Sequence, residues 1–186
     1  MAGLVVCAAI VLTPLLVLML LYNALVRDRN ACDEAWADID AELKRRYDLI
    51  PNLVSTVQGY VHHERETLER CTQARATAMA NRGSPRSQAD DENVLVRSLR
   101  QVLAVAESYP ALKANENFLA LQTELANTED RIQRSRRFYN ANVREYHNRL
   151  QSFPSNLVSG LFSFADREFF EIENVAEREA PAVKLS

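Results

Sequence analysis

The first 26 residues, MAGLVVCAAIVLTPLLVLMLLYNALV (residues 1–26), decide how the chain is organised. Of these residues 22 are apolar, none is charged, and the first charged side chain is Arg27. The apolar run from Leu4 to Tyr22 approaches the ~20 residues that a helix needs to cross ~30 Å of hydrocarbon. The sequence therefore predicts a transmembrane helix at about residues 4–23, within an N-terminal segment that ends at residue 26.

A cleaved signal peptide is the alternative interpretation of this run. It requires a basic segment before the apolar residues and a small-residue cleavage site after them. No basic residue precedes the run, and residues 21–26 (LYNALV) contain no A-x-A pattern. We therefore favour a retained span that makes the lipid bilayer the first partner of the chain.

The distribution of Lys and Arg predicts the orientation of this span. Basic residues follow the span and none precedes it, which favours an outside N-terminus and a cytoplasmic domain. Three cysteines without evident partners fit a reducing compartment. We expect a single-pass protein of the inner (plasma) membrane, and the inverted topology is the alternative.

The remaining residues, 27–186, are predicted to form one domain. About 41% of them are apolar, as is typical of a solvated domain. The chain has only four glycines and six prolines, which argues against many-stranded sandwiches and barrels. Its net charge of −3 shows no basic excess, so we expect no nucleic-acid partner.

Apolar residues recur every seven positions along much of this domain, which predicts long helices that bury one face. We expect the first to continue through Pro51 with a kink, because the apolar series keeps its phase there. Asp40/Lys44 and Glu42/Arg46 are interpreted as pairs on its solvated face. The predicted helices lie at about residues 24–81, 87–108, 115–152 and 166–177, with a short tail from about 178. The predicted fold is all-α: a transmembrane helix followed by an elongated up-and-down helical bundle.

No motif predicts catalysis. The spacing of a phosphate-binding loop is absent, and His62 and His63 lack a second histidine four residues further on, as a zincin would need. We predict no catalytic residue, no metal site and no cofactor, and therefore not an enzyme.

The third long helix carries the candidate polar positions. Beside its apolar series, the companion positions are small or polar where a hydrophobic seam would carry Leu or Ile. Close helix packing with buried hydrogen bonds is the favoured explanation, and a groove for a small ligand or an anionic lipid head group is the sharper one. The candidate binding positions are Thr128, Arg131, Arg134, Ser135 and Asn142.

Several long stretches closely resemble the bacterial LemA family. They include residues 22–30 (YNALVRDRN), 43–54 (LKRRYDLIPNLV), 107–118 (ESYPALKANENF) and 153–156 (FPSN). The resemblance extends over nearly the whole chain from the membrane segment onward. It implies a short outside N-terminus, one span and a largely helical cytoplasmic domain, and it implies no reaction and no catalytic residues.

Together these observations predict a membrane-anchored interaction or scaffold protein of the LemA type. Its expected partners are the bilayer and one or more proteins or further copies of the chain. The alternative function is a small-ligand or anionic-lipid binder, or an undetected enzyme, that uses the polar positions within the bundle.

Overall fold

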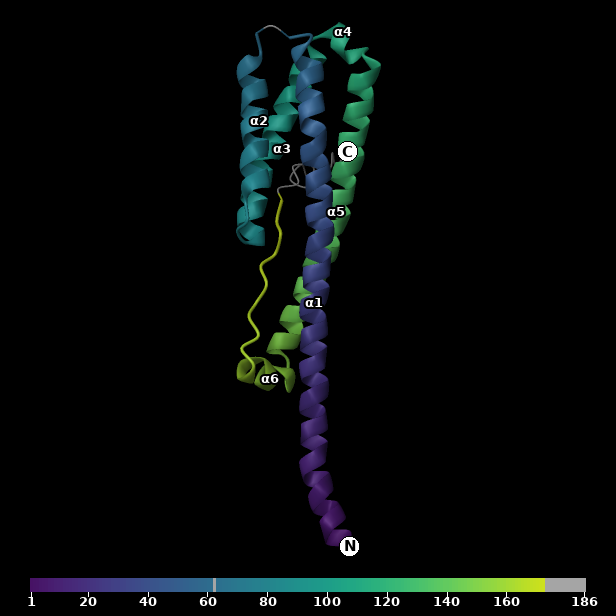
Figure 1. Ribbon diagram of the computed structural model, residues 1–186, viewed down its shortest axis with the longest axis vertical. Helices are drawn as coiled ribbons and strands as arrows, with labels where there is room; N and C mark the ends of the chain where they lie inside the picture. Colours follow the sequence, from purple (N-terminus) through teal and green to yellow (C-terminus); the bar gives the residue numbers. More distant parts are fainter. Residues whose placement is uncertain (62, 173–186) are drawn as a thin grey trace, which may run out of the picture. The chain divides into compact units, whose positions relative to one another are not determined.

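The computed structural model describes residues 1–61 and 63–172, which form six α-helices and no strand (Figure 1). The prediction of an all-α chain is confirmed. The predicted tail from about residue 178 lies outside the described residues. The helices are α1 (Ala2–Gln58), α2 (Arg65–Ala80), α3 (Pro85–Glu107), α4 (Pro110–Lys113), α5 (Glu116–Gln151) and α6 (Ser155–Leu161).

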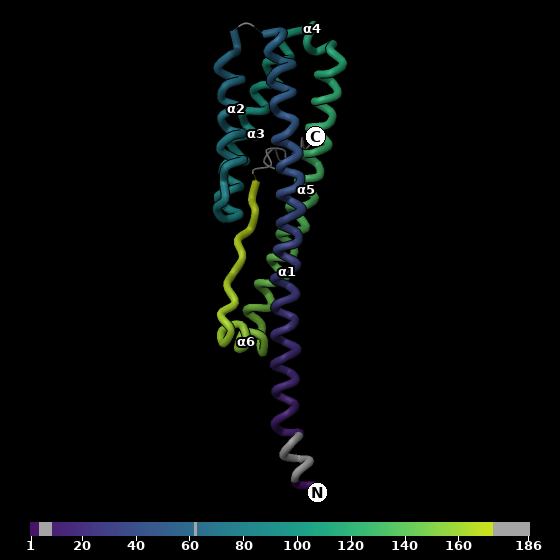
Figure 2. The backbone as a smooth tube through the Cα atoms, in the orientation of Figure 1, coloured from purple at the N-terminus to yellow at the C-terminus, as the bar shows by residue number. Residues whose placement is uncertain are grey.

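The chain divides into two compact units. Unit 1 comprises Met1–Leu43 and Asp130–Phe169, and unit 2 comprises Lys44–Glu129 and Phe170–Ser186. The two longest helices, α1 and α5, therefore each contribute one part to each unit. Within unit 1, the tube in Figure 2 turns back at the end of α5 to form α6.

The N-terminal part of α1 exposes its apolar side chains. Ile10, Leu12 and Leu20 are each more than half exposed. In the described part of the chain, α1 is the one helix long and apolar enough to cross a membrane, and 6% of its most apolar stretch is buried. This is the segment that the sequence predicts to span.

Unit 1 buries one stripe of each long helix. On α1, Leu25, Cys32 and Ile39 are buried at intervals of seven residues. On α5, Ile132 and Tyr139 are buried with the same spacing. The heptad pattern seen in the sequence thus reports a real buried face.

The first helix ends earlier than predicted. It continues through Pro51 but stops at Gln58, and a new helix, α2, begins at Arg65. Backbone amides of Tyr60 and Val61 donate to the Val57 carbonyl and close the last turn. Val61 and Leu68 are buried, so the apolar series persists across a break in the helix, which is why the series concealed it.

Pro51 lies inside α1, and a side chain of α2 donates to the carbonyl that the missing amide of Pro51 would have served. Proline has no amide hydrogen, so the carbonyl four residues earlier, that of Tyr47, receives no helical hydrogen bond from position 51. Arg75 of α2 donates from Nε to this carbonyl over 2.6 Å. The proline is thereby linked to the packing of α2 against α1 in unit 2.

The C-terminal segment also differs from expectation. Residues 166–172 are not helical, and residues 173–177 of the predicted last helix lie outside the described part. Phe170 and Ile172 are buried while Glu171 is exposed, an alternation typical of extended backbone. Two tyrosine hydroxyls of α5 bond this segment: Tyr139 donates to the Glu168 carbonyl over 2.8 Å, and Tyr146 donates to the Ala165 carbonyl over 3.1 Å.

Candidate functional site

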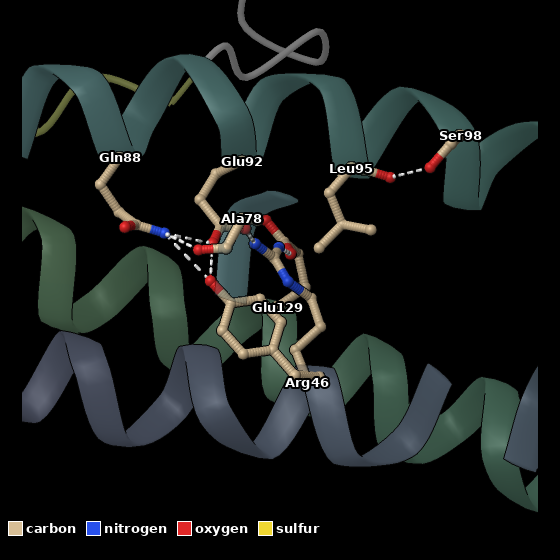
Figure 3. Close-up of polar contacts among 8 residues, drawn as sticks. Arg46, Ala78, Gln88, Glu92, Leu95, Ser98 and Glu129 are labelled. Carbon is tan, nitrogen blue, oxygen red and sulfur yellow. Dashed lines mark hydrogen bonds and ion pairs between the residues drawn. The ribbon is translucent and has the colours of Figure 1, made fainter. Parts of the chain in front are cut away.

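A cluster of buried polar side chains lies inside unit 2 (Figure 3). Three helices supply it: α1 provides Arg46 and Tyr47, α3 provides Gln88 and Glu92, and α5 provides Glu129. Arg46 is 1% exposed and Glu92 is fully buried. Burial of a charge without a partner is costly, so such groups are retained only where partners surround them.

The local sequence places each of these side chains on a buried stripe. On α1, Arg46 lies between the buried residues Leu43 and Ile50, at the three- and four-residue spacing of a helix face. On α3, Gln88 and Glu92 precede Leu95 at the same spacing. The start of α3 is fixed by Ser84, whose side chain accepts from the Ser87 amide, and by Pro85 in the first turn.

The Arg46 guanidinium is shared between two carboxylates. Its Nη1 donates to Glu129 over 2.8 Å, and its Nη2 donates to Glu92. Tyr47 donates its hydroxyl hydrogen to the second Glu92 oxygen, so both oxygens of the buried carboxylate are engaged. Among the described residues, Arg46 Nε is buried without a hydrogen-bond partner.

Gln88 closes the network on the side of α2. Its Nε2 lies 3.0 Å from the Tyr47 hydroxyl, 3.0 Å from Glu92 Oε1 and 3.1 Å from the Ala78 carbonyl. The cluster therefore connects α1, α2, α3 and α5 through polar contacts. Its chemistry is that of a structural ion group, because two carboxylates already neutralise the guanidinium and both oxygens of Glu92 are engaged.

A surface cavity of about 260 Å³ opens beside this cluster, between α3 and α5. Arg46 and Glu129 form its polar wall. Most of the remaining lining is apolar, and Arg100 and Gln122 lie exposed at the rim. The apolar residues that line it are Val96, Leu99, Leu103, Leu125 and Ala126.

The five predicted polar positions are not gathered in one unit. Thr128 belongs to unit 2, whereas Arg131, Arg134, Ser135 and Asn142 belong to unit 1. The Thr128 hydroxyl donates to the Glu124 carbonyl of its own helix over 2.8 Å. Arg131 pairs with Glu42 at 3.1 Å.

The other three positions differ in exposure. Arg134 is exposed, and Ser135 is partly buried. Asn142 is also partly buried, and its Nδ2 has no hydrogen-bond partner within the described part of the chain. Binding at these positions stays a prediction.

The buried cluster is not what the sequence predicts, because the spacing of Glu42 and Arg46 favours a pair on the solvated face. The structure corrects this: Arg46 is buried with Glu92 and Glu129, and Glu42 pairs with Arg131 instead. The signal was present, since Arg46 occupies a position in the apolar stripe of α1. The acid-first spacing of Glu42 and Arg46 outweighed it, although such pairs contribute only tenths of a kcal/mol, ~0.2–0.5 each.

The two described cysteine side chains are poor nucleophiles. Cys32 and Cys71 are free thiols, 1% and 0% exposed. Burial raises the pKa of both, since it disfavours the charged thiolate. These thiols are therefore shielded from reagents in the folded protein.

Comparison with known proteins gives a consistent result. The model of the LemA family matches residues 35–185. The chain is 31% identical over 157 residues to Protein LemA of Metamycoplasma hominis, covering 82% of this chain and 71% of that protein.

Similarity also extends to magnetosome proteins. The chain is 30% identical over 74 residues to magnetosome protein MamQ 2 of Paramagnetospirillum magneticum, covering 40% of this chain and 27% of that protein. It is 20% identical over 178 residues to magnetosome protein MamQ of Magnetospirillum gryphiswaldense, covering 82% of this chain and 65% of that protein.

Proposed function

Because this chain belongs to the LemA family, we propose that it is a single-pass membrane-anchored protein whose helical bundle docks a protein partner. The anchor is the exposed apolar part of α1, and the docking site is the cavity between α3 and α5. We further propose that the protein lies in the inner membrane with its N-terminus outside and its bundle in the cytoplasm.

The cavity between α3 and α5 is the observation that carries this proposal. Its volume of about 260 Å³ is below the ~300–1,000 Å³ of most small-molecule pockets. A cavity of ~150 Å³ already holds benzene, so this one accommodates an apolar side chain of a partner. An apolar centre with a polar rim formed by Arg100, Gln122 and Glu129 is the arrangement found at protein–protein contacts.

Photo-crosslinking in native membranes tests the docking site. A photoreactive amino acid at Arg100, on the rim, is expected to give a defined crosslinked product, either with another protein or with a second copy. Leu103→Arg in the same chain should abolish that product, because it places a charge in the apolar cavity. Val94→Arg, on the same helix at a residue that is 48% exposed and does not line the cavity, is the matched control. Loss of the product in both variants, or in neither, would contradict the proposal.

A second candidate function is favoured by the buried Nδ2 of Asn142, which has no hydrogen-bond partner among the described residues. Here the polar positions of α5 that belong to unit 1 bind a small ligand or an anionic lipid head group, with Arg134 as the exposed cation. A photoreactive group at Arg134 distinguishes the two candidates. Products from Arg134 that survive Leu103→Arg would favour this second function over docking at the cavity.

Topology requires an introduced cysteine, because Cys32 and Cys71 are buried. Ser108→Cys places a thiol at an exposed position just after α3. We expect a membrane-impermeant maleimide to label it in lysed cells but not in intact cells. Labelling in intact cells would place the bundle outside.

A further inference from the structure

We propose that α6 and the residues flanking it form a second membrane contact, whose apolar side chains enter the interfacial layer of the same phospholipid bilayer that the N-terminal span crosses. This inference rests on the proposed function, since it requires the span to be inserted. Every residue that carries it belongs to unit 1.

The surface of this corner is unusually apolar. Within ten residues, Phe153, Leu157, Leu161 and Phe162 are 79%, 64%, 71% and 47% exposed. Single exposed apolar residues are ordinary, whereas a contiguous group of them marks a binding surface. Four large exposed apolar side chains on one short turn-and-helix segment therefore indicate a surface that is covered by another molecule or by lipid.

Contacts with α1 fix the level of this surface along the span. The Tyr22 ring lies 4.8 Å from the Phe162 ring and 5.6 Å from the Phe164 ring, in edge-on arrangements. Tyr22 is the last residue of the long apolar run, and tyrosine is enriched where a span meets the water interface. The exposed side chains of α6 consequently lie at the boundary between hydrocarbon and head groups.

A basic group lies where lipid phosphates would be. The Arg29 guanidinium is 5.6 Å from the centre of the Phe164 ring, above one of its faces. Arg29 follows Tyr22 by seven residues, or ~10 Å along a helix, so its backbone lies just beyond a head-group layer ~5–8 Å thick. Helix side chains tilt towards the N-terminus, which directs the long Arg29 side chain back into that layer. A cavity of about 310 Å³ here is lined by Tyr22, Arg29, residues 162–166 and Arg167. Arg167 is already paired with Asp33, so Arg29 is the guanidinium that supports a lipid contact here. Exposed apolar side chains on α6 with this guanidinium beside them match the layering of a lipid surface.

A bilayer accounts for this combination better than another protein does. The surface is continuous, through Tyr22, with the helix that is itself exposed and apolar from Ile10 to Leu20. Any occupant of α6 must therefore fit beside the lipid around that helix. The bilayer meets this condition without a further component.

Tryptophan quenching in vesicles tests the inference with the full-length chain. The vesicles contain phosphatidylcholine and phosphatidylglycerol, with bromine either near the glycerol or near the ends of the acyl chains. The wild type, whose one tryptophan is Trp36, gives the baseline. Leu161→Trp is expected to add fluorescence that is lost with bromine near the glycerol and largely retained with bromine near the chain ends, because interfacial groups insert ~5–10 Å.

Two further variants separate this inference from the proposed anchor. Leu12→Trp, within the span, should lose its fluorescence with bromine near the chain ends. Phe138→Trp is the matched control, because Phe138 is 58% exposed and belongs to the same unit. Its position is next to Tyr139, whose ring centre lies 5.4 Å from that of Trp36, so it reports on the region of the native tryptophan. It should be quenched by neither lipid.

The outcomes are distinct. Quenching of Leu12→Trp but not of Leu161→Trp overturns the second contact and leaves the anchor intact. Absence of quenching at Leu12→Trp overturns both. An unquenched Leu161→Trp together with disulfide-linked dimers from Leu161→Cys would instead assign α6 to contact between two copies.

Discussion

At the scale of single residues, the buried Arg46–Glu92 pair is the feature whose disruption should cost the most stability. A pair of this kind adds little net stability over apolar packing, but removal of one partner strands a charge inside the protein. Glu92 is fully buried, so its dependence on Arg46 is strong. The pair joins α1 to α3, and a shift of either helix along the other would separate the two charged groups.

Arg46→Met is therefore expected to lower the free energy of unfolding by about 3–5 kcal/mol. Urea denaturation of the detergent-solubilised chain measures this loss. Arg70→Met removes an exposed i,i+4 pair with Glu66 and should change stability by less than about 1 kcal/mol. Equal effects of the two substitutions would refute a structural role for the buried pair. Adding Glu92→Met to Arg46→Met should recover part of the loss, because the fully buried carboxylate is then removed as well and Glu129 is 36% exposed.

Tyr139 predicts a loss of stability at high pH. Burial is the main cause that raises the pKa of Tyr139 to about 12; Cys32, Asp33 and Glu168 add to this, and Arg167 opposes it. The unfolded chain releases this proton near pH ~10. The stabilising contribution is complete below pH ~10 and is lost as the pH rises towards 12.

Absorbance titration of the phenolate groups checks this expectation. Tyr139→Phe should remove a tyrosine step near pH 12. Persistence of that step in the variant would assign it to a different tyrosine.

At the scale of elements, one sequence signal served well. Asn115 was expected to begin the third long helix, and its Oδ1 accepts from the Phe118 amide over 3.0 Å at the start of α5. The heptad series then follows the helix to Gln151. Sequence patterns suffice to predict α5, because the Asn115 cap and the apolar stripe both belong to this one helix.

Other elements required tertiary information. The break after Gln58 has no proline and only one glycine, and the apolar phase continues across it. Residues 166–172 are held extended by tyrosines about 20–30 positions earlier in the chain. The partners of Arg46 lie 46 and 83 residues away. The position of Arg46 in the apolar stripe indicates its burial, but no local pattern identifies the distant carboxylates that pair with it. The cluster was therefore not predicted, although the helices α3 and α5 that supply those carboxylates were.

The contact between Arg75 and the Tyr47 carbonyl yields a prediction at this scale. Arg75→Met leaves that carbonyl without the donor that replaces the missing amide of Pro51, and should cost about 1–3 kcal/mol. In a Pro51→Ala background the amide of residue 51 can serve the carbonyl, and the same substitution should cost less. A double-mutant cycle by urea denaturation measures the difference. Additive effects would show that the arginine acts elsewhere.

At the scale of the whole molecule, membrane attachment and folding of the bundle depend on different parts of the chain: attachment depends on the apolar part of α1, and folding does not. Its large side chains are exposed, so its removal deletes little of either core. The chain lacking residues 1–20, which keeps Tyr22 and the buried Leu25, is expected to leave the membrane pellet in alkaline carbonate, whereas the full chain stays in it. Circular dichroism should show that the truncated chain retains its helices. Retention of this chain in the washed pellet would mean that other segments anchor it.

The discontinuity of unit 1 has a consequence for biosynthesis. The contact between the Tyr22 and Phe162 rings can form only after Phe162 has been translated, 140 residues after Tyr22. At the usual ~5–20 residues/s, this is roughly 7–28 s later. The stretch 44–129 of unit 2 emerges whole before that point. The nascent chain thus spends many seconds with its first helix synthesised and the stripe of Leu25, Cys32 and Ile39 uncovered. A ribosome paused in that interval would carry a nascent chain whose unit 1 is incomplete. We expect chaperones and membrane insertases to bind the chain at this stage.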